Sequence, residues 1–174
     1  DASTDDTWRI LQTLKQDHPG KITILRSSCN GGTYLAKNLA LTQARGEFVL
    51  FQDADDRSHP DRVMIQLQPL LQNPQLMATR CAYARYDDVT GKVIELGGKL
   101  SRIGLITTAV RRQVFDQVGY FEAVRKAGDD EWVQRLIHFK GTDQVQSLNV
   151  TLYMAELRPD SLMTDMLKPR ADGR

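Results

Sequence analysis

The sequence predicts an α/β fold in which a mixed β-sheet is flanked by helices. Two patterns support this class. In the first half of the chain, segments with helical spacing alternate with short apolar runs, an order typical of a parallel sheet. In the second half, two strand-like runs flank a turn at 87–91, which predicts a hairpin and antiparallel edge strands. Apolar residues make up 41% of the 174 residues, enough for one buried core.

The first helix is expected to follow Ser3, which forms an approximate capping box with Asp6. Trp8, Leu11 and Leu14 then recur at helical spacing until a His-Pro-Gly run ends the pattern.

A short apolar run at 22–25 predicts the first strand. A second helix is predicted over 33–44, because Leu35, Leu39 and Thr42 lie on one helical face. We expect that face to point toward the core.

The next segment predicts a strand, an acidic loop and a helix. Residues 48–51 have the β-branched and aromatic character of a strand that is buried on both faces. Asp53, Asp55 and Asp56 follow at its carboxyl end, and a helix that begins with proline is predicted over 60–72. The apolar residues that we expect on its inward face are Val63, Leu67, Leu70 and Leu71.

The remaining predicted elements are strands over 76–86, 92–96, 103–110 and 145–154, and helices over 111–118 and 131–140. The last helix carries four apolar residues on one face, Trp132, Val133, Leu136 and Ile137, and we expect Trp132 to be a core residue. Residues 1–156 are expected to form the folded domain, and 157–174 a polar C-terminal tail or linker.

Charge and cysteine content exclude several classes of function. Lys and Arg number 23 against 22 acidic residues, so no nucleic-acid partner is indicated. Only Cys29 and Cys81 are present, which indicates neither a disulfide framework nor a zinc site, and free thiols fit a reducing cytosol. No apolar run approaches the roughly 20 residues that a transmembrane helix needs. We therefore expect a cytoplasmic protein, or one that lies peripherally at the inner face of a membrane.

The three carboxylates after the strand at 48–51 indicate a metal site. Like charges packed this closely repel unless a cation or strong hydrogen-bond donors lie among them. In open α/β sheets, ligands bind at the carboxyl ends of strands, and hard oxygen ligands there suit Mg²⁺ or Mn²⁺. The alternative is that one acid favours the dipole of the following helix, which accounts for one aspartate but not for three.

Other aspartate-rich sites fit the loop less well. An EF-hand beginning at Asp53 needs Gly and Glu where this chain has Ser58 and Met64. A phosphatase of the DxDx(T/V) type needs Thr or Val where the chain has Arg57, and no GxxxxGK(S/T) phosphate-binding loop occurs. A DxD loop that holds a divalent cation against a diphosphate remains.

Four blocks of sequence resemble family-2 glycosyltransferases with the GT-A fold, in order and in approximate spacing. They are DASTDD at 1–6, NGGTYLAKN at 30–38, ARGEFVLFQDADD at 44–56 and GDDEWVQR at 128–135. The resemblance implies a Rossmann-like mixed sheet flanked by helices. Because the family's first strand precedes the turn that DASTDD resembles, we expect an N-terminally truncated domain.

The resemblance also implies a reaction. A sugar would move with inversion, assisted by Mg²⁺ or Mn²⁺, from a nucleotide-diphosphate donor to a hydroxyl of a sugar, polysaccharide or lipid acceptor. A UDP-sugar is the favoured donor, and the product would belong to surface polysaccharide or glycolipid synthesis.

On the donor side, the resemblance assigns roles to five residues. Asp1 would contact the nucleotide base or ribose, and Asn30 and Gly32 would line the donor pocket, where a missing side chain lets the backbone approach the ligand. Lys37 would contact the diphosphate in place of the family's usual arginine. Asp53 would contact the ribose, the metal or a metal-bound water. Asp1 could instead cap the N-terminal turn, and Lys37 could be a solvated helix residue.

The other acids of these blocks have separate expected roles. Asp55 would be the direct metal ligand, and Asp56 would either support the metal ligands without touching the metal or cap the helix that follows. Asp129 matches the family's catalytic base, with Asp130 as the second candidate, and a helix N-terminus there would favour a negative charge. The alternative is that both acids only cap the helix over 131–140. Glu131 and Arg135 are expected to pair.

Two other functions remain open at the level of sequence. A nucleotidyltransferase also uses paired aspartates with Mg²⁺. It would carry a glycine-rich nucleotide loop near its first strand, and that region is absent from this sequence. The other is a truncated module that binds a sugar nucleotide, or a protein partner, without turnover.

Overall fold

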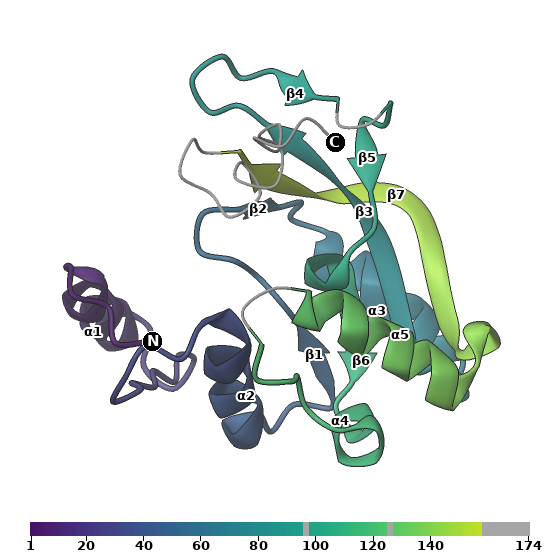
Figure 1. Ribbon diagram of the computed structural model, residues 1–174, viewed down its shortest axis with the longest axis horizontal. Helices are drawn as coiled ribbons and strands as arrows, with labels where there is room; N and C mark the ends of the chain where they lie inside the picture. The colour runs from purple at the N-terminus through teal and green to yellow at the C-terminus, as the bar shows by residue number, and fades with distance from the viewer. Residues whose placement is uncertain (96–97, 125–126, 158–174) are drawn as a thin grey trace, which may run out of the picture.

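The computed structural model describes residues 1–95, 98–124 and 127–157, so the predicted tail lies outside the described residues except for Leu157. In these residues a mixed sheet separates helices on its two faces (Figure 1). The helices are α1 (Thr7–Asp17), α2 (Thr33–Gln43), α3 (Arg62–Gln72), α4 (Gln113–Val118) and α5 (Gly128–Lys140), with 3₁₀ turns η1 (Leu105–Thr107) and η2 (Thr142–Gln144). None of the helices in this part of the chain is long and apolar enough to cross a bilayer.

The sheet follows the order β1-β6-β3-β7-β2, with β4 and β5 also paired to β3. Its strands are β1 (Phe48–Leu50), β2 (Arg57–Ser58), β3 (Ala78–Tyr86), β4 (Val93–Ile94), β5 (Ser101–Arg102), β6 (Thr108–Arg111) and β7 (Val145–Glu156). β3 and β7 are parallel, and the other pairings are antiparallel. The parallel pair expected in the first half does not form, because residues 22–25 are not a strand and β1 pairs instead with β6, antiparallel to it.

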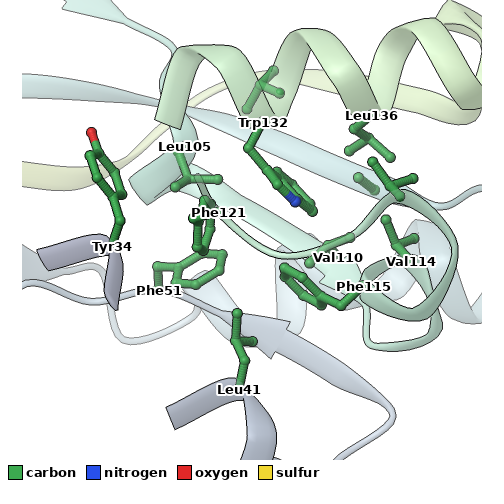
Figure 2. Packing of buried hydrophobic residues seen from close by; sticks show 13 residues of the cluster. Tyr34, Leu41, Phe51, Leu105, Val110, Val114, Phe115, Phe121, Trp132 and Leu136 are labelled. Atoms are coloured by element: carbon green, nitrogen blue, oxygen red, sulfur yellow. The ribbon is translucent and has the colours of Figure 1, made fainter. Parts of the chain in front are cut away.

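Each face of the sheet has its own apolar core. On one face, α5 and α4 cover a cluster whose centre is Trp132, which is 0% exposed and stacks on Phe115 with ring centroids 4.9 Å apart (Figure 2). On the other face, Leu70 of α3 packs with Leu76 and Ala109. The prediction that Trp132 is a core residue is confirmed.

The predicted strand at 22–25 is wrong, because these residues pair with no strand of the described chain. Figure 1 shows why: α1 and the segment after it lie to one side of the sheet. Apolar character alone cannot make a strand, since its backbone groups need a neighbour to bond. Helix α1 forms as predicted, but Asp6 is its N-terminal boundary residue without a side-chain cap bond, so the capping box with Ser3 is not formed.

Helix α2 buries a different face from the one that we expected, whereas the expectation for α3 is confirmed in part, since Leu70 is buried and Leu67 packs beside it. In α2, Leu35 and Leu39 are 43% and 38% exposed, whereas Tyr34 and Leu41 are buried. In α3, Val63 and Leu71 are 55% and 65% exposed. The buried stripe of α3 consists of Arg62, Gln66 and Leu70, four residues apart.

The predicted strand over 103–110 is interrupted. The hydroxyl of Thr107 donates to the carbonyl oxygen of Gly104 at 2.9 Å and accepts from its N–H at 3.3 Å, which closes the turn η1. The strand β6 begins only after this turn. Helix α5 begins at Gly128, three residues before its predicted start, so Asp129 and Asp130 both lie in its first turn.

Candidate active site

The acidic loop forms a tight turn directly after β1. The backbone N–H of Asp56 donates to the carbonyl oxygen of Asp53 at 3.2 Å, which closes a turn over residues 53–56. Asp53, Asp55 and Asp56 are all partly exposed. The predicted acidic loop is therefore present at the end of the strand that should deliver it.

Asp56 does not cap α3, which corrects that expectation. Its Oδ2 accepts a hydrogen bond from the hydroxyl of Tyr153 at 2.8 Å, and its Oδ1 accepts one from the backbone N–H of Glu156 at 2.9 Å. Both donors belong to β7. Burial raises the pKa of Asp56 above its ordinary value, while the bond from Glu156 opposes this shift.

Hydrogen bonds of Gln52 also support the acidic loop. The side-chain amide of Gln52 donates to the carbonyl oxygens of Asp53 at 3.0 Å and Asp56 at 2.9 Å. Its own oxygen accepts from the hydroxyl of Ser58 at 2.6 Å. The buried guanidinium of Arg62 donates to that same hydroxyl at 2.9 Å, so the loop is tied to α3.

Lys37 connects helix α2 to the acidic loop. Its ammonium group donates to Oδ1 of Asp53 at 3.1 Å and to the hydroxyl of Thr33 at 3.0 Å. The lysine side chain is only 19% exposed. A solvated helix lysine would be far more exposed, so its charge is directed toward the loop.

The N-terminal aspartate lies at the beginning of α2. Asp1 accepts hydrogen bonds from the backbone N–H of Gly31 at 2.8 Å and of Gly32 at 2.9 Å, and Asn30 accepts from Gly32 at 3.2 Å. Gly32 has φ +86°, a conformation that favours glycine. The structure thus brings together three residues that we expected at a donor pocket. It shows no cap bond between Asp1 and Ser3 among the described residues.

Asp129 lies in the first turn of α5, and its Oδ1 accepts a hydrogen bond from the hydroxyl of Tyr34 at 2.7 Å. The ring of Tyr34 lies at the rim of the apolar cluster, and its hydroxyl points away from the cluster (Figure 2). Burial raises the pKa of this phenol to about 12, with the bond to Asp129 adding to the shift. Gly128 makes this contact possible, because a Cβ there would lie 3.0 Å from the tyrosine ring.

Asp130 points elsewhere. It is exposed. Burial lowers the pKa of Arg80, and the negative charge of Asp130 partly offsets this shift. Glu131 and Arg135 form the expected pair at 2.8 Å, and Arg135 also donates to the carbonyl oxygen of Val118.

Helix α2 therefore links the two halves of the candidate site. Tyr34 reaches the first turn of α5 and Lys37 reaches the acidic loop, three residues apart on neighbouring positions of one helical face. Sequence reasoning did not single out Tyr34, Tyr153 or Gln52. The only signal for the two tyrosines is that a buried phenol usually has a hydrogen-bond partner.

The carboxylates of the acidic loop are suited to a divalent cation that is bound jointly by protein and substrate. In the described part of the chain, no three or more His, Cys, Asp or Glu side chains come together as a metal cage. Mg²⁺ and related hard cations are commonly held by one or two carboxylates together with the phosphates of a substrate. Asp53 and Asp55, two carboxylates on one turn, match in number and type the protein ligands of such a cation.

The chain matches a known protein family. The family model described as glycosyl transferase family 2 matches residues 1–140. A glycosyltransferase of Haemophilus influenzae is 31% identical over 107 residues, which are 62% of this chain and 42% of that protein. The poly(ribitol-phosphate) β-N-acetylglucosaminyltransferase TarS of Staphylococcus aureus is 43% identical over 56 residues, 32% of this chain and 10% of that protein.

Solved structures show the same fold. The crystal structure of S. aureus TarS 1–349 in complex with UDP-GlcNAc has a TM-score of 0.72 at 20% identity, covering 94% of this chain and 50% of that one. The mannosyltransferase PcManGT from Pyrobaculum calidifontis, in complex with GDP-Man and Mn²⁺, has a TM-score of 0.69 at 18% identity, covering 94% and 48%. The chain thus spans half or less of the length of these relatives.

These similarities confirm the predicted GT-A fold, a mixed sheet flanked by helices. Because the family model matches residues 1–140 of 174, the chain belongs to glycosyl transferase family 2.

Proposed function

We propose that this chain provides the side chains that bind the sugar donor, and the catalytic base, of a glycosyltransferase. This enzyme would move a sugar, with inversion, from a nucleotide-diphosphate donor to an acceptor hydroxyl. One observation supports this most strongly. Tyr34 and Lys37 of the same helix bond Asp129 at 2.7 Å and Asp53 at 3.1 Å. Since residues rise by about 1.5 Å each along a helix, these two anchors lie about 4.5 Å apart along its axis. The proposed base and the proposed donor site therefore face one shared region.

On the donor side, the chain offers a positive charge for a diphosphate and carboxylate oxygens for its nucleoside. The ammonium group of Lys37 can turn from Asp53 to an incoming phosphate oxygen. Asp1, held by the N–H groups of Gly31 and Gly32, supplies carboxylate oxygens that accept from a base or a ribose hydroxyl. A UDP-sugar is the donor that we propose, because TarS, which has a similar fold, is described in complex with UDP-GlcNAc.

On the acceptor side, we propose that Asp129 is the catalytic base. Its Oδ1 is held by the phenol of Tyr34, so Oδ2 can accept the proton of the acceptor hydroxyl. As that proton leaves, the hydroxyl oxygen forms a bond to the anomeric carbon and the bond to the diphosphate breaks. The positive end of the α5 dipole favours the carboxylate until it takes the proton.

A divalent cation, Mg²⁺ or Mn²⁺, would be held by Asp55 and Asp53 and would offset the negative charge that develops on the leaving diphosphate. The structure of PcManGT, which has a similar fold and is in complex with GDP-Man and Mn²⁺, supports the use of a divalent cation. For the product, we propose a surface polysaccharide or glycolipid. The relatives include TarS and a β-1,3-glucosyltransferase of Escherichia coli that is named for a diphosphoundecaprenol acceptor.

The experiment uses transfer to water, because the acceptor is open. The protein is incubated with UDP-α-N-acetylglucosamine and Mn²⁺, and the first sugar released is followed by proton NMR before its anomers equilibrate. A single displacement predicts the β-anomer. Early appearance of the α-anomer, or no release of UDP above the enzyme-free rate, would contradict the proposal.

A further inference from the structure

The acidic loop is held by a tyrosine that lies 100 residues further along the chain and that the proposed reaction does not use. The hydroxyl of Tyr153 donates to Oδ2 of Asp56 at 2.8 Å and accepts from the backbone N–H of Asp53 at 3.1 Å. One hydroxyl group thus joins both ends of the turn that carries Asp55.

Strand β7 holds Asp56 through a second bond as well. The backbone N–H of Glu156 donates to Oδ1 of this carboxylate at 2.9 Å, so both of its oxygens are bonded to one strand. The short strand β2 continues the connection, because Ser58 pairs with Tyr153 in the antiparallel register. Asp56 is therefore an anchor for the loop, with both oxygens already occupied.

The tyrosine itself has little freedom to move. Its side chain is 0% exposed, and the guanidinium of Arg62 lies over its ring, 4.8 Å from the centroid. Arg62 is in turn fixed by Gln66 at 2.9 Å and by the carbonyl oxygen of Ile106 at 2.6 Å. The hydroxyl of Tyr153 is thus a rigid reference point on the sheet.

We propose that Tyr153 is a positioning residue for the metal and donor site, because it fixes the separation of Asp53 and Asp55 by holding Asp53 and Asp56. The inference rests on the proposed function, in which those two carboxylates hold a cation. A hard cation needs its ligands within a few tenths of an ångström of their ideal places, and groups that orient ligands typically change metal affinity by roughly 10- to 100-fold. Without the hydrogen bonds of the Tyr153 hydroxyl, part of the free energy of metal binding would be used to order the loop.

The test is Tyr153→Phe, which keeps the ring, its burial and its contact with Arg62 but removes the hydroxyl. Binding of Mn²⁺ is measured from the electron paramagnetic resonance signal of free Mn²⁺, with UDP present. The expected result is an affinity weaker by about tenfold. Circular dichroism at the assay temperature checks that each variant is folded.

Tyr86→Phe is the matched control. Tyr86 is also buried on the sheet, but its hydroxyl has no hydrogen-bond partner among the described residues. Its removal should leave the Mn²⁺ affinity unchanged. Equal affinities in the folded Tyr153→Phe and Tyr86→Phe proteins would overturn the inference.

Asp55→Asn separates this inference from the proposed function. If Asp55→Asn weakens Mn²⁺ binding but Tyr153→Phe does not, the metal site stands and the positioning role of Tyr153 is wrong. If Asp55→Asn binds Mn²⁺ as tightly as the parent protein, or the parent protein binds none, the metal site itself is wrong, and the inference falls with it.

Discussion

The hydrogen bond between Tyr34 and Asp129 can be tested by Tyr34→Phe, which removes one oxygen atom and keeps the ring. The ring is 8% exposed and packs against Phe121, with centroids 5.9 Å apart, so its packing should survive. What is lost is a 2.7 Å bond to a carboxylate. Hydrogen bonds to charged groups contribute about 1.5–3 kcal/mol. We expect a loss near the lower end, about 1.5 kcal/mol, because Asp129 is partly exposed and water can replace the phenol.

The assay is urea unfolding of four proteins: the parent, Tyr34→Phe, Asp129→Asn and the double variant. The double-mutant cycle isolates the pairwise term from the separate effects of each change. The expected coupling free energy is about 1 kcal/mol or more. A coupling below about 0.3 kcal/mol, the additivity that independent sites show, would refute the reasoning.

The same bond predicts a pH dependence. Because the pKa of Tyr34 rises from 10.0 to about 12 in the folded protein, the phenol stabilises the fold fully below pH 10. Its contribution is lost as the pH rises from 10 to 12, where the folded protein must release a proton that it holds more tightly than the unfolded chain. The stability difference between the parent and Tyr34→Phe should therefore shrink over this window. A difference that stays constant to pH 12 would contradict the assignment.

Two further predictions concern the supports of the site. Arg62→Met should lower the free energy of unfolding by about 3 kcal/mol, because buried Gln66 and a carbonyl oxygen lose their donor, whereas the half-exposed Arg112→Met should cost about 1 kcal/mol or less. Urea unfolding measures both, and equal losses would contradict the buried network. Gly128→Ala should cost about 1–3 kcal/mol, because its Cβ would lie 2.9 Å from Cγ2 of Val124 and 3.0 Å from the ring of Tyr34. A neutral effect in the same assay would show that this ring does not need the space.

Local patterns predicted the parts of the fold and site that depend on neighbouring residues. The first turn of α5 brings Asp129 to a helix N-terminus, as the sequence block around it indicated. The acidic loop likewise follows β1, since both lie within a single run of residues. The pairing of Glu131 with Arg135 depends only on helical spacing, and it is confirmed.

Long-range partners could not be predicted in this way. Tyr153 and Asp56 are 97 residues apart, and no periodicity connects them. The inward face of α3 was predicted only in part, for a related reason. Arg62 and Gln66 count as polar in any hydrophobic pattern, yet both are buried because partners elsewhere in the chain satisfy their hydrogen bonds. The apolar run at 22–25 shows the reverse case, since a strand depends on a neighbour that its own residues do not specify.

In the proposed reaction, Asp129 and not its neighbour Asp130 removes the acceptor proton. The most direct measurement is the rate of UDP release from UDP-N-acetylglucosamine with Mn²⁺, compared among the parent, Asp129→Asn and Asp130→Asn proteins. General base catalysis contributes about 10²–10⁴-fold, so Asp129→Asn should be at least about 100-fold slower, and Asp130→Asn should stay close to the parent rate. A rate near that of the parent in Asp129→Asn, or a larger loss in Asp130→Asn, would contradict the account.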